Sequence, residues 1–296
     1  MWSPSPKQKR FSSKSNKRSL VTLYVQLLDL DPTCYYKYMP AFAQNLFTMT
    51  KHKYLKHTFK PYEIDREISG EHYRFYIADP VAKEWYDTTS TVWPEMDFLK
   101  EHLIVPGDVI LECGAHHGIT TCHFSKSTGP KGQVVAFEPS PFNVTVIEKN
   151  LKLNHLRNVK VVNKAIGDKP GKAHFSFVSN ASIQKGAAGT FEIDVTTIDT
   201  YADLKPTMLK IDVEGYDVEA LQGAKQVLKT RPKIALEIHT TQLPNFGHTV
   251  QDIFDLLDLT DYKCTIMGEG KFRPLGKVSD ITTNVHLFAV PKNSAK

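Results

Sequence analysis

Over the last two thirds of the chain, short and largely apolar runs alternate with longer segments that contain both apolar and polar residues. The apolar runs lie at 109–111, 134–137, 159–162, 208–211, 234–238 and 285–290. Segments with helical spacing lie between them, at 119–126, 142–154, 218–228 and 250–259. Short apolar strands that alternate with helices are typical of a parallel sheet covered on both faces. The pattern therefore predicts an α/β, doubly wound fold from about residue 90 onward.

Other segments depart from this alternation. Residues 68–78 read as a strand between the turn signals Gly70 and Asp79-Pro80, and Pro94 marks the first turn of a further helix. Segments 175–178 and 191–195 predict an inserted antiparallel pair. For 20–60, where periodicity is weak, we expect short helices joined by turns.

The positive charge is concentrated at the N-terminus. Residues 1–19 hold six Lys or Arg and no acid, and removing these six charges from the net +5 leaves the rest at −1. We interpret 1–19 as a basic disordered tail, although such a tail can also touch nucleic acid, membrane phosphates or a targeting receptor. Beyond this tail there is no strong nucleic-acid signal. We divide the remainder into an N-terminal extension, 20–90, which could cap an acceptor pocket, and a main domain, 91–292.

Composition excludes several classes of protein. With 41% hydrophobic and 23% charged residues, the chain is neither disordered nor collagenous. No apolar run reaches the roughly 18 residues that span a bilayer, and no small-residue cleavage site follows the run 20–28. The four cysteines form no C-x-x-C pair, which favours reduced thiols and a cytoplasmic location unless the basic tail is a targeting segment.

Two features indicate an adenosine-containing ligand. Gly114 and Gly118 permit a tight turn between a strand and a helix whose free N–H groups suit an anion. Glu138 follows the next strand, where such folds hold ribose hydroxyls. The dinucleotide fingerprint G-x-G-x-x-G is absent, which opposes an NAD oxidoreductase. Glu112, just before the turn, would repel a pyrophosphate but attract an ammonium, so the residues favour S-adenosylmethionine over NAD.

A set of motifs in this order resembles the FkbM-type S-adenosylmethionine-dependent methyltransferases. The motifs are ECGAHHGITT at 112–121, FEPSP at 137–141 with Asn143, Asn150 and Asn154, AIGD at 165–168, VTTID at 195–199, LKIDVEGY at 209–216 and LEIH at 236–239. The resemblance runs from about Trp93 to His239. It implies a class I methyltransferase fold, a mostly parallel sheet with an antiparallel strand near the C-terminus, and methyl transfer to oxygen on a sugar or other small, natural-product-like acceptor.

The resemblance also implies roles for individual residues. The positions implied for cofactor binding are Glu112, Gly114, Ala115, His116, Gly118, Thr121, Glu138, Asn163, Ala165, Ile166 and Asp212. The glycine loop would hold the methionine end, Glu138 the ribose, and the residues after the third strand would lie near the adenine. This chain departs from the usual pattern at two places, with Glu112 in place of Asp and His116 in place of Asn, and the second change could alter cofactor contacts.

Methyl transfer to oxygen requires alignment of the reactants and removal of the hydroxyl proton. Asp212 and His239 are the candidate bases, and Glu214 could position a hydroxyl without taking a proton. Glu237 could instead be a buried, paired structural acid. We predict no metal, but Asp212, Glu214, Glu237 and His239 could also converge on a divalent cation.

Several alternatives remain open or are disfavoured. Cys113, His116, His117, Cys122 and His123 match no zinc spacing and are better explained as buried Cys and loop His. The aromatic residues Trp85 and Trp93 could form an acceptor platform, although aromatics are more often core. The run 211–214 lacks the proline-containing loop of nucleic-acid amino-methyltransferases, and its acids oppose a phosphate backbone. An RNA or protein methyltransferase and a non-catalytic S-adenosylmethionine-binding protein stay open as alternatives.

Overall fold

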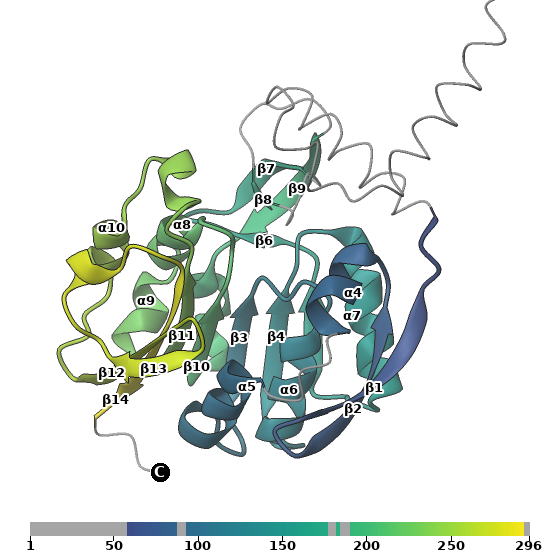
Figure 1. Ribbon diagram of the computed structural model, residues 1–296. Helices are drawn as coiled ribbons and strands as arrows, with labels where there is room; N and C mark the ends of the chain where they lie inside the picture. Colours follow the sequence, from purple (N-terminus) through teal and green to yellow (C-terminus); the bar gives the residue numbers. More distant parts are fainter. Residues whose placement is uncertain (1–57, 88–92, 177–181, 184–189, 293–296) are drawn as a thin grey trace, which may run out of the picture. The chain divides into compact units, whose positions relative to one another are not determined.

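The predicted alternation produces a large parallel sheet in the computed structural model, which describes residues 58–87, 93–176, 182–183 and 190–292 (Figure 1). The parallel strands are β3 (Val109–Cys113), β4 (Gln133–Phe137), β5 (Val159–Val162), β10 (Met208–Ile211) and β11 (Lys233–Ile238). Their order across the sheet is β11-β10-β3-β4-β5, so β3 lies at the centre. This part of the α/β prediction is confirmed.

The C-terminal strand also has the predicted direction. β14 (Val285–Pro291) runs antiparallel to β11 and lies between β11 and β12 (Tyr262–Gly268). A further strand, β13 (Lys271–Pro274), pairs with β12 at the edge of the sheet. The sequence analysis did not predict β12 and β13. β13 is exposed along its length and therefore carries no apolar signal.

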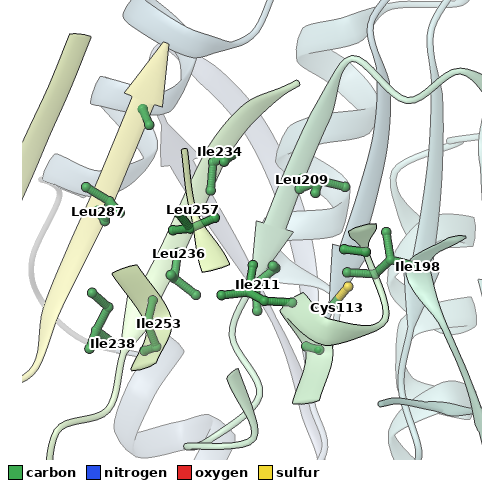
Figure 2. Packing of buried hydrophobic residues seen from close by; sticks show 14 of the residues in the cluster. Cys113, Ile198, Leu209, Ile211, Ile234, Leu236, Ile238, Ile253, Leu257 and Leu287 are labelled. Carbon is green, nitrogen blue, oxygen red and sulfur yellow. The ribbon is translucent and has the colours of Figure 1, made fainter. Parts of the chain in front are cut away.

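Alternating residues of the strands face two separate apolar layers, because successive side chains of a strand point to opposite faces. Leu111, Leu209 and Leu236 pack with helices α8 (Asp217–Gln222), α9 (Lys225–Lys229) and α10 (Val250–Leu256), as Figure 2 shows in part. Ile110, Met208 and Ala235 pack on the other face with α5 (Pro94–Phe98), α6 (Ile119–Thr128) and α7 (Pro141–Leu153). Helices therefore cover both faces, as a doubly wound fold requires.

The predicted helix 218–228 is interrupted at Gly223, which separates α8 from α9. A Cβ atom at this position would lie 2.1 Å from the carbonyl oxygen of Gly167. The chain therefore needs glycine here so that the helical segment can pass close to the loop after β6 (Ala165–Ile166). Periodicity alone does not reveal such a backbone contact, which is why the interruption was not predicted.

Residues 60–87 belong to the same unit of the chain as the sheet, since the chain divides between Phe59 and Lys60. They form a hairpin of β1 (Tyr62–Ile68) and β2 (Glu71–Ile77), followed by α4 (Pro80–Tyr86). Asn150 on α7 accepts a hydrogen bond from the backbone N–H of Tyr76, at 2.7 Å, and thereby fastens the hairpin to the domain. The tail 1–19 and the segment 20–57 lie outside the described residues, and the boundary at residue 90 stays a prediction.

The remaining elements are short. β7 (Gly171–Ser176) pairs antiparallel with β9 (Thr190–Thr196), in a small sheet with β6 and β8 (Ser182–Ile183). The predicted strand 191–195 corresponds to β9. The predicted strand 175–178 overlaps β7 only at 175–176, and 177–178 lie outside the described residues. Short helical segments, which are not α-helices, lie at Leu99–Leu103, Ile198–Leu204, Leu243–Phe246 and Val278–Asp280. Pro94 opens α5, as predicted. None of the helices in the described part of the chain is long and apolar enough to cross a membrane.

Candidate functional site

A cavity of about 460 Å³ lies beyond the carboxyl ends of β3, β4, β10 and β11. This volume is within the range of small-molecule sites. Its wall includes these predicted site residues: Gly114, Ala115, His116, Glu138, Ala165, Ile166, Asp212, Glu214 and His239. Because the carboxyl ends of parallel strands meet at one edge of a sheet, residues distant in sequence come together there.

The loop from Gly114 to Gly118 turns tightly between β3 and α6. Gly114, His116 and Gly118 all have positive φ, at 89°, 48° and 78°. A Cβ atom on Gly114 would lie 1.8 Å from the carbonyl oxygen of Asp212, so no other residue fits without displacing the backbone. The loop therefore lies directly against the end of β10.

His116 contacts the cavity as a neutral ring. Burial, together with the neighbouring His117 at a ring-centroid distance of 4.1 Å, lowers the pKa of His116 to about 3. The Tyr86 hydroxyl lies 2.7 Å from Nδ1 of His116, and the His116 backbone N–H donates to Glu138 Oε2 at 2.9 Å. The loop is thereby joined both to α4 and to the end of β4.

Glu138 follows β4 and presents a carboxylate to the cavity. Its Oε1 accepts hydrogen bonds from the Ser140 backbone N–H, at 2.8 Å, and from Asn143 Nδ2, at 3.2 Å. Burial raises the pKa of Glu138 to about 7. A carboxylate has about four acceptor positions, so Glu138 retains capacity to accept from a ligand hydroxyl.

Four predicted cofactor residues do not line the cavity: Glu112, Gly118, Thr121 and Asn163. Glu112 is 1% exposed and accepts a hydrogen bond from Thr121 Oγ1 at 2.6 Å, so this hydroxyl is used inside the protein. Burial raises the pKa of Glu112 to about 8. Asn163 Nδ2 donates to the carbonyl oxygens of Glu138 and Pro139 and so holds the backbone around the carboxylate.

Near the cavity, neighbouring strands of the sheet carry a row of ionisable side chains where apolar side chains would otherwise pack. Lys210 on β10 is opposite Glu112 on β3, and Glu237 on β11 is opposite His286 on β14. Glu95 of α5 joins the row, with its Oε1 3.6 Å from Lys210 Nζ and 3.4 Å from His286 Nδ1. Burial alone would raise the pKa of Glu95, but Lys210 and His286 outweigh it and hold the value at about 2.

The turns after β10 and β11 bring Asp212, Glu214 and His239 together. Nε2 of His239 lies 3.8 Å from Asp212 Oδ1 and 3.5 Å from Glu214 Oε2. Its distance to Glu237 Oε1 is 3.4 Å. Glu214 adopts φ 54° and Gly215 φ 89°, and a Cβ atom on Gly215 would lie 2.6 Å from Cβ of Gln242, in the turn after β11. The structure therefore places all the predicted catalytic residues in one group on the cavity wall.

The Methyltransferase FkbM domain profile matches residues 112–264, just over half of the chain. The chain belongs to this family. FkbM domains are S-adenosylmethionine-dependent methyltransferases with a class I fold, and S-adenosylmethionine is therefore the cofactor of this one. The predicted family, fold and cofactor are confirmed.

Solved structures similar to this FkbM domain include several methyltransferases. Methyltransferase FkbM from Methylobacillus flagellatus KT is 20% identical, with a TM-score of 0.42 over 62% of this chain and 44% of that one. This chain thus spans less than half of that protein. An O-methyltransferase from Thermotoga maritima is 18% identical, with a TM-score of 0.44 over 79% of each chain. A putative rRNA methylase from Clostridium thermocellum is 13% identical, with a TM-score of 0.44 over 68% of this chain and 95% of that one. No curated protein sequence matches.

The residues on the cavity wall fit S-adenosylmethionine. Glu138 can accept hydrogen bonds from ribose hydroxyls, and Thr120 in the first turn of α6 lines the wall near the glycine loop. The acids Glu138, Asp212 and Glu214 suit a ligand that carries a sulfonium and an ammonium group. In the FkbM domain, these residues would hold the cofactor, while Ala165 and Ile166 line the wall beyond Glu138.

The sequence analysis missed several residues of the site. Tyr86, Glu95, Lys210, Gln242, Asn284 and His286 contribute to the cavity or to its ionic row. Lys210 and His286 carried a usable signal, because each interrupts an apolar strand at a position facing the same layer. Trp85 and Trp93 line the cavity, which an acceptor platform of aromatic residues would require.

Proposed function

We propose that this domain transfers a methyl group from S-adenosylmethionine to a hydroxyl oxygen of a carbohydrate or another small acceptor. The observation that supports it best is the group of Asp212, Glu214 and His239 on the cavity wall. A hydroxyl must lose its proton when oxygen is methylated, and this group offers both a hydrogen-bond acceptor and an imidazole. The proposal includes a cytoplasmic location, supported by the free thiols of Cys113, Cys122 and Cys264.

The wall residues divide the work by position. The cofactor supplies an electrophilic methyl group on a sulfonium sulfur. The glycine loop and Glu138 orient the ligand from one side, and Asp212 lies against this loop. When the acceptor oxygen takes that methyl group, its proton would pass to His239 or to one of the carboxylates. Three carboxylates within 3.8 Å of His239 Nε2 would stabilise the imidazolium that results.

The acidic wall also argues against a nucleic acid as acceptor. The cavity is lined by three acids at this end, Asp212, Glu214 and Glu237. Among the described residues, the wall contains one Lys and no Arg, and this Lys is Lys164. Proteins that bind nucleic acids neutralise the phosphates with Lys and Arg. An acidic wall would instead repel these phosphates. A neutral, hydroxyl-rich acceptor would not be repelled by these carboxylates.

The test follows a labelled methyl group. Purified protein is incubated with S-adenosylmethionine, labelled at the methyl carbon, and separately with small-molecule, RNA and protein fractions of a cell extract. We expect label in the small-molecule fraction, on a carbon that NMR identifies as a methoxy group. Label confined to RNA or protein, or found on nitrogen or carbon, would overturn the proposal. A reaction without the protein measures background transfer, and Asp212→Asn should transfer the label more slowly than the wild type.

A further inference from the structure

Asp212, Glu214 and His239 have the arrangement of a metal-binding triad. One ligand atom from each lies within 4.8 Å of the others. The three residues extend from the ends of β10 and β11, two neighbouring parallel strands, and all three line the cavity. Two ligands about 2.1 Å from one ion are about 3.0–3.6 Å apart at angles near 90–120°. The distances of 3.5 and 3.8 Å from His239 Nε2 to the two carboxylates are within a few tenths of an ångström of this range.

His239 is an independent indication of a ligand. Its side chain lines the cavity wall and is 6% exposed, yet Nδ1 is buried without a hydrogen-bond partner. Nε2 faces three carboxylates at ion-pair distances. A buried imidazole with this surrounding would be held firmly by a cation that it shares with the carboxylates.

The cations that the protein supplies nearby have other partners. Lys210 Nζ lies 3.4 Å from Asp212 Oδ2 but is also 3.6 Å from Glu95. His286 pairs with Glu95 and Glu237 and makes no ion pair with Glu214. Glu214 Oε2 lies 3.5 Å from His239 Nε2, and His239 also faces Asp212 and Glu237. Negative charge at this end of the cavity therefore exceeds what the neighbouring side chains neutralise.

We propose that Asp212, Glu214 and His239 bind one divalent cation on the cavity wall. Two carboxylates and one imidazole suit Mn²⁺ or Mg²⁺, which accept oxygen ligands and leave further positions for water or an acceptor oxygen. The sequence analysis predicted no metal but left open a divalent cation at these residues, and the present proposal takes up that alternative. The inference concerns binding of the cation and does not need the proposed acceptor to be correct. With a cation on Nε2, His239 cannot take the acceptor's proton, which would then pass to a carboxylate.

The test is a titration of chelator-treated, full-length protein with MnCl₂, followed by the electron paramagnetic resonance signal of free Mn²⁺. We expect one saturable site per chain, for which Mg²⁺ competes. Glu214→Gln and His239→Gln should each weaken binding by at least about tenfold. Glu192→Gln, at an exposed acid on β9, and His248→Gln, at a histidine paired with Glu219, are matched controls that should bind as wild type.

Two results would overturn the proposal: no saturable Mn²⁺ site in the wild-type protein, or an unchanged site in both triad variants. Circular dichroism and S-adenosylhomocysteine binding establish whether each variant is folded. If a variant does not fold, pulsed electron paramagnetic resonance of Mn²⁺ bound to the wild type decides the matter. Coupling to a directly bound imidazole nitrogen is expected, and its absence would exclude His239 as a ligand. Because no acceptor is present, failure here is distinguishable from failure of the proposed methyl transfer.

Discussion

Gly114 and Asp212 touch through their backbones, with only 1.8 Å between the position of a Cβ on Gly114 and the Asp212 carbonyl oxygen. Gly114 begins the glycine loop on the cavity wall, which is predicted to hold the cofactor, and Asp212 begins the turn that carries Glu214. The two halves of the site are therefore fixed relative to each other by a backbone contact that only glycine permits.

Gly114→Ala should disrupt this contact. The methyl group must displace backbone rather than a flexible side chain, and the residue would also have to keep φ near 89°. Each strained backbone residue costs about 1–3 kcal/mol, so we expect a lower free energy of unfolding by at least about 2 kcal/mol and loss of S-adenosylhomocysteine binding. Urea unfolding and calorimetric titration measure the two effects.

Gly107→Ala is the matched control for that experiment. Gly107 has a positive φ of 92°, close to that of Gly114, but a Cβ atom there would meet nothing within 4 Å. We therefore expect a smaller destabilisation and unchanged ligand binding. Equal effects of the two substitutions would mean that φ alone, and not the contact with Asp212, makes glycine necessary at position 114.

The sequence predicted the sheet well because its central strands are apolar and buried on both faces. The runs at β3, β4 and β10 lie within a residue or two of their observed bounds. The same criterion failed at β1, where polar and apolar residues alternate, and at β13, which is exposed. Such strands exist because of their partners in the sheet, which local composition does not record.

Glu138→Gln should weaken cofactor binding. The amide keeps an oxygen that can accept from the Ser140 N–H but loses the charge that strengthens hydrogen bonds to ribose hydroxyls. We expect about a 10- to 100-fold rise in the Kd of S-adenosylhomocysteine, measured by calorimetry. Glu148→Gln, at an exposed position of α7, should leave the Kd unchanged. An unaltered Kd in Glu138→Gln would remove this residue from the ribose site.

Glu112→Gln should make the protein more stable at high pH. Burial raises the folded-state pKa of Glu112 from 4.5 to about 8, so the folded protein retains this proton where the unfolded chain has lost it. The stability that protonated Glu112 contributes to the wild type is therefore fully present below about pH 4.5. As the pH rises toward 8, the free energy of unfolding of the wild type falls relative to that of the variant. The difference should reach a few kcal/mol, and Gln can still accept the hydrogen bond from Thr121.

Urea unfolding of both proteins at pH 5, 7 and 9 checks this effect. Each protein should be measured without added ligand or metal, because a cation bound nearby would stabilise the ionised form of Glu112. Glu148→Gln, at the exposed site, should give curves parallel to wild type at every pH. Parallel curves for Glu112→Gln would show that Glu112 is ionised in the folded protein throughout this range.

Residues of the cavity wall were predictable where a motif placed them at strand ends, as for Glu138 and Asp212. The sequence could not show that Thr121 is turned inward to Glu112, because the helix register depends on how α6 packs. Nor could it show Glu95 next to Lys210, since α5 and β10 are more than a hundred residues apart in the chain. Ionic contacts between distant elements are set by packing and not by local pattern.

Lys210→Met tests whether the ionic row is structurally necessary. Removing a buried cation leaves Glu95 and Asp212 without their shared partner, which typically costs about 3–5 kcal/mol of unfolding free energy. Adding Glu95→Gln should recover part of this loss, with a coupling energy of about 1–3 kcal/mol in a double-mutant cycle. Lys172→Met removes an exposed ion pair with Glu192 and should leave stability unchanged. Strictly additive effects of Lys210→Met and Glu95→Gln would show that these two residues do not stabilise each other.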